Sequence, residues 1–311
     1  MPVLAGYFVV IAAILTGCTL SGGTLSAFIQ PAELLIIAGA SGGTFLAGNT
    51  GPALLAVLRA LPETLRGSRY GAALASELLA LLFHLLSRAR HRGMLVLDAE
   101  IMRPHDSPLF QRYPRVLANP LLLACITDCL RLRLMGNLDD RDMDALLAME
   151  ADTLEQEREG PAGGIIRLAD ALPAFGIVAA VLGVIHALGS TDRGAHELGA
   201  LVAQAMVGTF LGILLSYGCV APLAARLRQQ YAETARMMHC VRLVMVADMR
   251  GCAPREAVES GRRALYADVR PSFSALEQTL SAVRQAENFA AVAERKYSGR
   301  LRAGVDDGGT V

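Results

Sequence analysis

Four long uncharged runs dominate the pattern of hydrophobic and polar positions in this chain. They extend over Met1 to Ala32, Leu34 to Leu58, Ala171 to Thr191 and Leu198 to Ala225. A helix needs about 20 predominantly apolar residues to cross the roughly 30 Å hydrocarbon core of a bilayer. The pattern therefore predicts membrane-spanning helices near residues 3–20, 33–50, 171–191 and 198–222.

Short polar segments join the predicted spans into two pairs. The stretch SGGTLSAFIQPAE separates the first pair, with Glu33 between the two apolar runs, and DRGAHE separates the second pair. We therefore expect an all-α polytopic membrane protein. Its expected parts are a hairpin at 1–58, a large helical domain at 59–169, a second hairpin at 170–226 and a C-terminal region at 227–311. The last residues, SGRLRAGVDDGGTV, have a composition typical of disorder.

Two other apolar stretches are expected to be buried helices rather than spans. GAALASELLALLFHLLS, within a helix predicted over residues 70–94, contains Glu77 and His84. NPLLLACITDCL, which begins at Asn119, is too short to cross a bilayer.

Arginine placement predicts the orientation. Of the 29 Lys and Arg residues, only Arg193 falls in a short hairpin turn, and all the others lie in residues 59–169 or after residue 225. Basic residues near span ends stay on the cytoplasmic side. We therefore expect a multi-pass protein of the bacterial inner membrane with both large segments and both termini in the cytoplasm.

Composition agrees with a membrane protein and excludes several other classes. The chain is 53% hydrophobic, with a mean hydropathy of +0.40 and no tryptophan. LTGC, which ends at Cys18, is similar to a lipoprotein cleavage box, but MPVLAGY lacks a basic n-region, so we expect an uncleaved span. The six cysteines form no CxxC pair, and the only lysine is Lys296, so neither a zinc site nor a Walker A loop is indicated. We expect no enzyme and no cofactor.

Small residues at four-residue spacing occur in three of the predicted spans. Such rows let helix backbones approach closely in a membrane. They serve either packing within the chain or association with further helices, and three rows on four helices favour an oligomer. The rows are Gly39, Gly43 and Ala47; Ala179, Gly183 and Ala187; and Gly208, Gly212 and Ser216.

Charged side chains are missing from the interior of the predicted spans. The polar groups there include Thr209 and His186, and His186 is better explained as a polar contact than as a proton relay. Ionisable groups inside membranes are functional candidates by default. Either nothing ionic crosses through this chain, or a partner supplies the acid.

Two prolines lie where the second hairpin meets the basic segments. Pro173 follows Asp170, a plausible N-cap, and is expected in the first turn of the third span, where a missing N–H costs little. Pro222 is expected in the last turn of the fourth span, where it removes the bond to the Gly218 carbonyl. Both prolines are either helix punctuation or a hinge.

A basic cluster precedes an acidic one in SRARHRGMLVLDAEI. Arg90 and its neighbours are followed, after a glycine turn, by Asp98 and Glu100. The arrangement is either an ordinary solvated face or a docking surface whose charges select the partner.

Long segments of the chain resemble the MotA family of flagellar motor stator subunits. The resemblance rests on LPAFGIVAAVLGVIHALGS, ELGALVAQAMVGTFLGILLSYG and RGMLVLDAEI, and it runs nearly end to end. It implies a ring of these chains around paired MotB helices. Each MotB helix would bring the membrane aspartate that the spans lack, and MotB would be anchored to peptidoglycan.

The resemblance also implies roles for particular residues. Arg90 and Asp98 would contact the rotor protein FliG, with Glu100 as a second acidic candidate, because the family usually has Glu where this chain has Asp98. Pro173 and Pro222 would couple ion passage to movement of the cytoplasmic domain. The ion path would pass Ala180 and Thr209.

Two other functions remain as alternatives. An energiser of outer-membrane processes, similar to ExbB or TolQ, would use protons in the same way with another partner, but the large segment after the second span argues against it. A solute transporter usually binds its substrate at discontinuous helices near the midplane. The spans show no charged or multiply polar site there.

The residue at position 180 predicts the coupling ion. Sodium-driven relatives have a threonine where this chain has Ala180, and without that hydroxyl fewer oxygens can replace a sodium hydration shell. We expect protons to drive the motor. Swimming speed should therefore persist when sodium is withdrawn at constant pH, and loss of motility would rule the proton assignment out.

Overall fold

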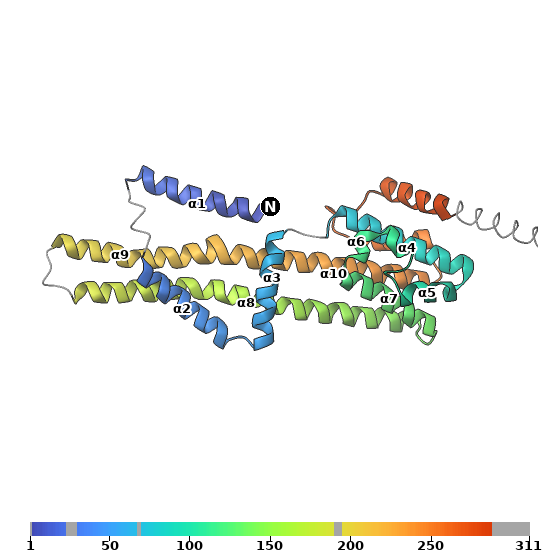
Figure 1. The fold of residues 1–311 in the computed structure, drawn as a ribbon, viewed down its shortest axis with the longest axis horizontal. Helices are drawn as coiled ribbons and strands as arrows, with labels where there is room; N and C mark the ends of the chain where they lie inside the picture. Colours follow the sequence, from blue (N-terminus) through green and yellow to red (C-terminus); the bar gives the residue numbers. More distant parts are fainter. Residues whose placement is uncertain (1, 23–29, 67–69, 190–194, 288–311) are drawn as a thin grey trace, which may run out of the picture. The chain divides into compact units, whose positions relative to one another are not determined.

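The structure is a computed structural model that describes residues 2–22, 30–66, 70–189 and 195–287. The C-terminal segment expected to be disordered lies outside these residues. All regular secondary structure in the described ranges is helical (Figure 1). The chain divides into two compact units. We call residues 1–68 with 154–232 the hairpin unit, and residues 69–153 with 233–311 the helical unit.

The hairpin unit contains the long apolar helices other than that at Ala72–Arg92. Its elements are α1 (Pro2–Leu20), α2 (Pro31–Ala47), α3 (Gly51–Arg66), the later part of α8 (Asp140–Leu188), α9 (Ala195–Ile213), a π-helical segment η4 (Leu214–Val220) and the start of α10 (Ala221–Met249).

The expected all-helical fold class with four long apolar helices is confirmed. Helices long and apolar enough to cross a membrane occur at Val3–Leu20, Ala72–Arg92, Asp140–Leu188 and Glu197–Met249. The second predicted span is instead the shorter helix α2, whose 17 residues extend about 25 Å.

The helix at Ala72–Arg92 is mostly buried against other parts of the chain. Within its apolar window 67% of the residues are buried in the structure, against none for Val3–Leu20. The leucine face predicted from the sequence is completely buried, at Leu78, Leu79, Leu82, Leu85 and Leu86. This burial agrees with the expectation that the helix packs against its own unit and is not a fifth span.

The helical unit assembles around that helix, α4. Its other elements are η2 (Met94–Leu97), α5 (Asp98–Met102), η3 (Phe110–Arg112), α6 (Pro114–Leu117), α7 (Pro120–Met135), the start of α8, the end of α10, α11 (Pro254–Ala264) and a helix over 273–287.

The short apolar stretch after Asn119 forms α7, as expected. The Asn119 side chain caps it by accepting a hydrogen bond from the Leu122 N–H at 3.3 Å. Gly136 ends it at φ +72°, a conformation that costs glycine little.

Arginine–aspartate pairs join the start of α8 to the end of α10 within the helical unit. Arg242 Nε lies 2.6 Å from Asp144, and Arg250 Nε lies 2.8 Å from Asp140. Hydrogen bonds from these guanidinium groups lower the pKa of both carboxyl groups. Both aspartates therefore stay ionised at neutral pH.

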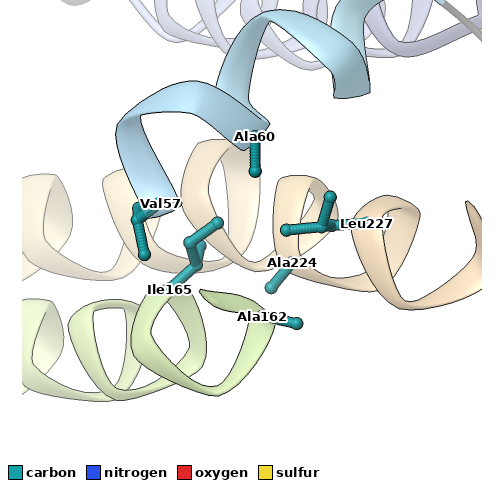
Figure 2. Packing of buried hydrophobic residues seen from close by; sticks show 6 residues of the cluster. All are labelled: Val57, Ala60, Ala162, Ile165, Ala224 and Leu227. Atoms are coloured by element: carbon teal, nitrogen blue, oxygen red, sulfur yellow. The ribbon is translucent and has the colours of Figure 1, made fainter. Parts of the chain in front are cut away.

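An apolar cluster joins three helices of the hairpin unit. Val57 and Ala60 come from α3, and they face side chains from α8 and α10 in Figure 2. All the residues of the cluster are almost completely buried. Its α8 and α10 members are Ala162, Ile165, Ala224 and Leu227.

Helices α8 and α9 approach so closely that glycines are required between them. A Cβ at Gly212 would lie 2.7 Å from the Leu172 carbonyl oxygen, and a Cβ at Gly183 would lie 2.7 Å from the Ala205 Cβ. The small-residue rows of the third and fourth predicted spans therefore pack against each other within the chain.

The row on α2 is different. A Cβ added at Gly39 or Gly43 would have no neighbour among the described residues within 4 Å. This row is therefore not used for packing within the described chain.

Substitution of Gly212 tests the close approach of α8 and α9. We expect Gly212→Ala to destabilise the hairpin by about 1–3 kcal/mol, because overpacking at a tight contact forces the helices apart. Gly199→Ala is the control on the same helix, because a Cβ there meets nothing within 4 Å in the described part of the chain. Thermal unfolding of the purified protein in detergent measures both, and equal midpoints would contradict the packing.

Candidate functional site

Pro173 lies inside a continuous helix. α8 runs from Asp140 to Leu188 without a break, so the expectation that Asp170 caps a new helix and that Pro173 lies in its first turn is wrong. A proline within a helix has no N–H for the carbonyl four residues before it. Pro173 therefore leaves the Ala169 carbonyl without its helical donor.

Ser216 provides the missing donor. Its hydroxyl donates to the Ala169 carbonyl oxygen at 2.6 Å, and the Ser216 residue has no exposed surface. The sequence indicated Ser216 only as a small packing residue. The signal that could have predicted its role is that Ala169 is four residues before Pro173, but the facing position on another helix cannot be read from spacing.

Ser216 itself belongs to the π-helical segment Leu214–Val220. The Ala221 N–H bonds to the Ser216 carbonyl, five residues back. The helix then continues as α10 instead of ending near Pro222, and Pro222 lies in the first turn of α10. Single π turns inside α-helices occur frequently at functional sites.

Helix α1 contacts the same segment. The Tyr7 hydroxyl donates to the Cys219 carbonyl oxygen at 2.6 Å. The two predicted hinge prolines thus lie beside one cluster of side-chain-to-carbonyl hydrogen bonds, formed by Tyr7 and Ser216.

The predicted ion-path residues lie on the two facing helices. Ala180 is on α8, and Thr209 follows Gly208 on α9. A Cβ at Gly208 would lie 3.3 Å from the Ala180 nitrogen, so the two helices are in contact at this level.

Glu33 changes the expectation of a hairpin unit without a buried acid. It lies in the first turn of α2 and is 9% exposed. Its Oε2 would lie 3.2 Å from a Cβ built at Gly208. The sequence placed Glu33 between two spans because the start of α2 could not be located from the apolar pattern alone.

The predicted rotor-contact charges lie in the helical unit. Arg90 is in the last turn of α4, where its guanidinium donates to the Cys252 carbonyl oxygen at 2.9 Å. Gly93 ends α4 at φ +86°, and Asp98 begins α5 with an exposed side chain.

Glu100 differs from Asp98. Arg88 Nη1 lies 2.6 Å from Glu100 Oε1, and the Glu100 side chain is only 14% exposed. The structure thus separates the two acidic candidates, because Glu100 already has a cationic partner and Asp98 faces outward.

Arg90 also lines a cavity of about 790 Å³ within the helical unit. His84 in its wall lies 3.2 Å from the Tyr113 hydroxyl and 3.1 Å from Glu287. Burial raises the pKa of Tyr113 to about 12, so the phenol stays neutral and can hydrogen-bond to the imidazole. Asp98 is not part of this cavity wall.

Comparison with known proteins extends this picture. Residues 4–93 match the family model for the N-terminal part of motility protein A, and residues 119–239 match that of the MotA/TolQ/ExbB proton channel family. Motility protein A of Escherichia coli K12 is 50% identical over 91% of this chain and 96% of its own length. Chemotaxis protein LafT of Vibrio parahaemolyticus is 35% identical over 90% of this chain and 99% of its own length.

Two solved structures have a similar fold. The C. jejuni MotAB structure aligns with a TM-score of 0.73 at 19% identity, covering 88% of this chain and 98% of the other. The MotAB stator complex of Bacillus subtilis aligns with a TM-score of 0.67 at 20% identity, covering 87% and 98%.

The apolar helices, the α8–α9 contact and the matching family model define a multi-pass helical membrane protein of the proton channel class. The 50% sequence identity to motility protein A of Escherichia coli K12, over nearly the whole length of both chains, makes the assignment more specific. The chain belongs to the motility protein A family.

A double-mutant cycle tests the pairing of Ser216 with the carbonyl that Pro173 leaves free. Ser216→Ala should cost about 1–3 kcal/mol, because a buried carbonyl loses its donor. In a Pro173→Ala background the cost should fall, because residue 173 then supplies a backbone N–H. Chemical unfolding of the purified protein in detergent gives the four free energies. An equal cost of Ser216→Ala in both backgrounds would contradict the pairing.

Proposed function

We propose that this chain is a stator subunit of a bacterial flagellar motor, which conducts protons together with MotB and converts their flow into torque on the rotor. The observation that carries the proposal is the 50% identity to motility protein A over nearly the full length of both chains. The fold shared with two MotAB structures supports the same function.

The proton path lies along α8 and α9, past Ala180 and Thr209. MotB supplies a membrane aspartate to this path. Support comes from the tight contact of the two helices at Gly208 and from the absence of a threonine hydroxyl at position 180.

Several copies of the chain surround the MotB helices in a ring. The small-residue row on α2 supports this arrangement, because a Cβ at Gly39 or Gly43 meets no described residue within 4 Å. Large apolar side chains on the same helix, including Leu35 and Leu46, are exposed and available to lipid or to a neighbouring copy.

Arg90 and Asp98 contact the rotor protein FliG from the cytoplasmic side of the membrane. Both side chains are exposed, and the strongly exposed Leu95 between them in sequence adds an apolar contact. The bond to Cys252 uses one nitrogen of Arg90 and leaves the other donors of its guanidinium for a partner carboxylate. Glu100 contributes less, because Arg88 already neutralises it.

Pro173 and Pro222 couple proton passage to movement of the helical unit. Support comes from the bond of Ser216 to the carbonyl that Pro173 leaves free and from the π segment Leu214–Val220, which ends two residues before Pro222. A π turn can change to regular α-helix by shifting its hydrogen-bond register, which turns the residues beyond it.

The alternative of an ExbB-like or TolQ-like energiser has less support. The match at residues 119–239 is shared by all three proteins, but the match at residues 4–93 is to motility protein A. The decisive experiment is complementation: this chain, expressed with its cognate MotB, should restore swimming to cells that lack a stator. Restored outer-membrane transport without swimming would favour the energiser.

Charge reversal tests the rotor contact. We expect Arg90→Glu and Asp98→Lys each to reduce swimming strongly, because a charge-complementary contact becomes repulsive. Membrane insertion, measured by the amount of protein in the membrane fraction, should stay unchanged. Asp152→Lys, at an exposed position of α8 in the same unit, is the control. Normal swimming after both reversals together would count against the contact.

A further inference from the structure

Glu33 is a buried acid that the proposed function does not yet use. It shares one face of α2 with Ile37 and Ser41, which are also buried, and α2 packs against α9. Its Oε2 atom is buried and has no hydrogen-bond partner among the residues that the structure describes. This oxygen therefore lies within the apolar hairpin unit without the hydrogen bond that a buried polar atom normally has.

The carboxyl fits a space that a glycine leaves open. A Cβ at Gly208 would lie 3.2 Å from Glu33 Oε2, 3.2 Å from the Ala179 Cβ and 3.3 Å from the Ala180 nitrogen. The acid is therefore next to the point where α8 and α9 meet, beside the proposed ion path.

This point lies well inside the α8–α9 hairpin. Ala180 is about 12 Å from the end of α8 at Leu188, and Gly208 is about 20 Å from the start of α9 at Ala195, at a rise of 1.5 Å per residue. Although Glu33 lies in the first turn of its own helix, its carboxyl lies beside residues that are well away from the connected ends of α8 and α9.

The surroundings of Glu33 Oε2 favour a carboxyl that can change between its ionised and its neutral form. A Cβ at Gly208 would meet Oε2 together with atoms of Ala179 and Ala180, and neither of these alanines, nor Gly208, has a side chain that titrates. An ionised carboxylate with no partner is costly in an apolar environment, whereas a protonated carboxyl costs less. Ionisable residues within membrane segments usually belong to ion or proton pathways.

We propose that Glu33 is a proton-binding carboxyl of this chain at the side of the ion path. Its carboxylate takes up one proton on Oε2, becomes a neutral carboxyl in the Gly208 niche, and returns the same proton to the path. The inference rests on the proposed stator function and adds a second acid to the one that MotB supplies.

Glutamine substitution separates this role from packing. Glu33→Gln keeps the shape of the side chain but cannot bind the proton, whereas Glu33→Asp keeps the acid on a shorter chain. Glu197→Gln is the matched control, because Glu197 is an exposed acid at the start of α9. Each variant is expressed with MotB in cells that lack a stator, and motor speed is recorded at low load and near stall.

We expect Glu33→Gln to lower the speed at low load severalfold and the torque near stall much less, because proton transfer limits a motor that carries little load. Glu33→Asp should retain part of the speed, and Glu197→Gln should match the wild type. Unchanged low-load speed in Glu33→Gln would overturn the proposal. Failure of the wild-type chain to restore rotation would instead overturn the stator function.

A second measurement reports the proton directly. The difference infrared spectrum of the reconstituted wild-type complex between high and low pH should contain a protonated-carboxyl band that is missing in Glu33→Gln. If the glutamine variant does not assemble, the band in Glu33→Asp should shift. A band that is unchanged in the variant measured would overturn the proposal.

Discussion

The hairpin unit depends on one requirement of the membrane interior, namely that every backbone carbonyl needs a donor where water is absent. Pro173 removes the donor for Ala169, and Ser216 replaces it at 2.6 Å from another helix. A bond that is normally internal to one helix has become a bond between two. The proline can therefore remain within a continuous helix without breaking it, and the helices at this level are held by polar contact as well as by packing.

Small residues also determine how closely helices α8 and α9 of the hairpin unit pack. Gly176, Gly183 and Gly212 allow backbone contact between α8 and α9, where even a methyl group would collide. Gly208 has another role, because the space beside it is occupied by the Glu33 carboxyl. Glycine thus allows two helices to touch at one level and leaves space for an acidic side chain at another.

Much of this architecture could be predicted from the sequence, and the parts that could not have a common reason. Apolar runs located the long helices, and the leucine spacing predicted the buried face of α4, because both signals are local. The sequence indicated a helix start at Asp170 and placed Glu33 in the segment between two spans, whereas Asp170 lies inside α8 and Glu33 lies in the first turn of α2. Each difference involves a neighbouring helix: Ser216 donates to the carbonyl that Pro173 leaves free, and Gly208 leaves space for the carboxyl of Glu33.

The ion pair between Arg88 and Glu100 has a consequence for how such a surface can evolve. Because this arginine masks one of two nearby acids, the outward charge of the segment is set by a residue that need not touch any partner. Substitution of Arg88 by a neutral residue would leave Glu100 as a second unpaired anion, two positions after Asp98. A substitution of Arg88 could thus change which partner the surface prefers, although every side chain that contacts the partner stays the same.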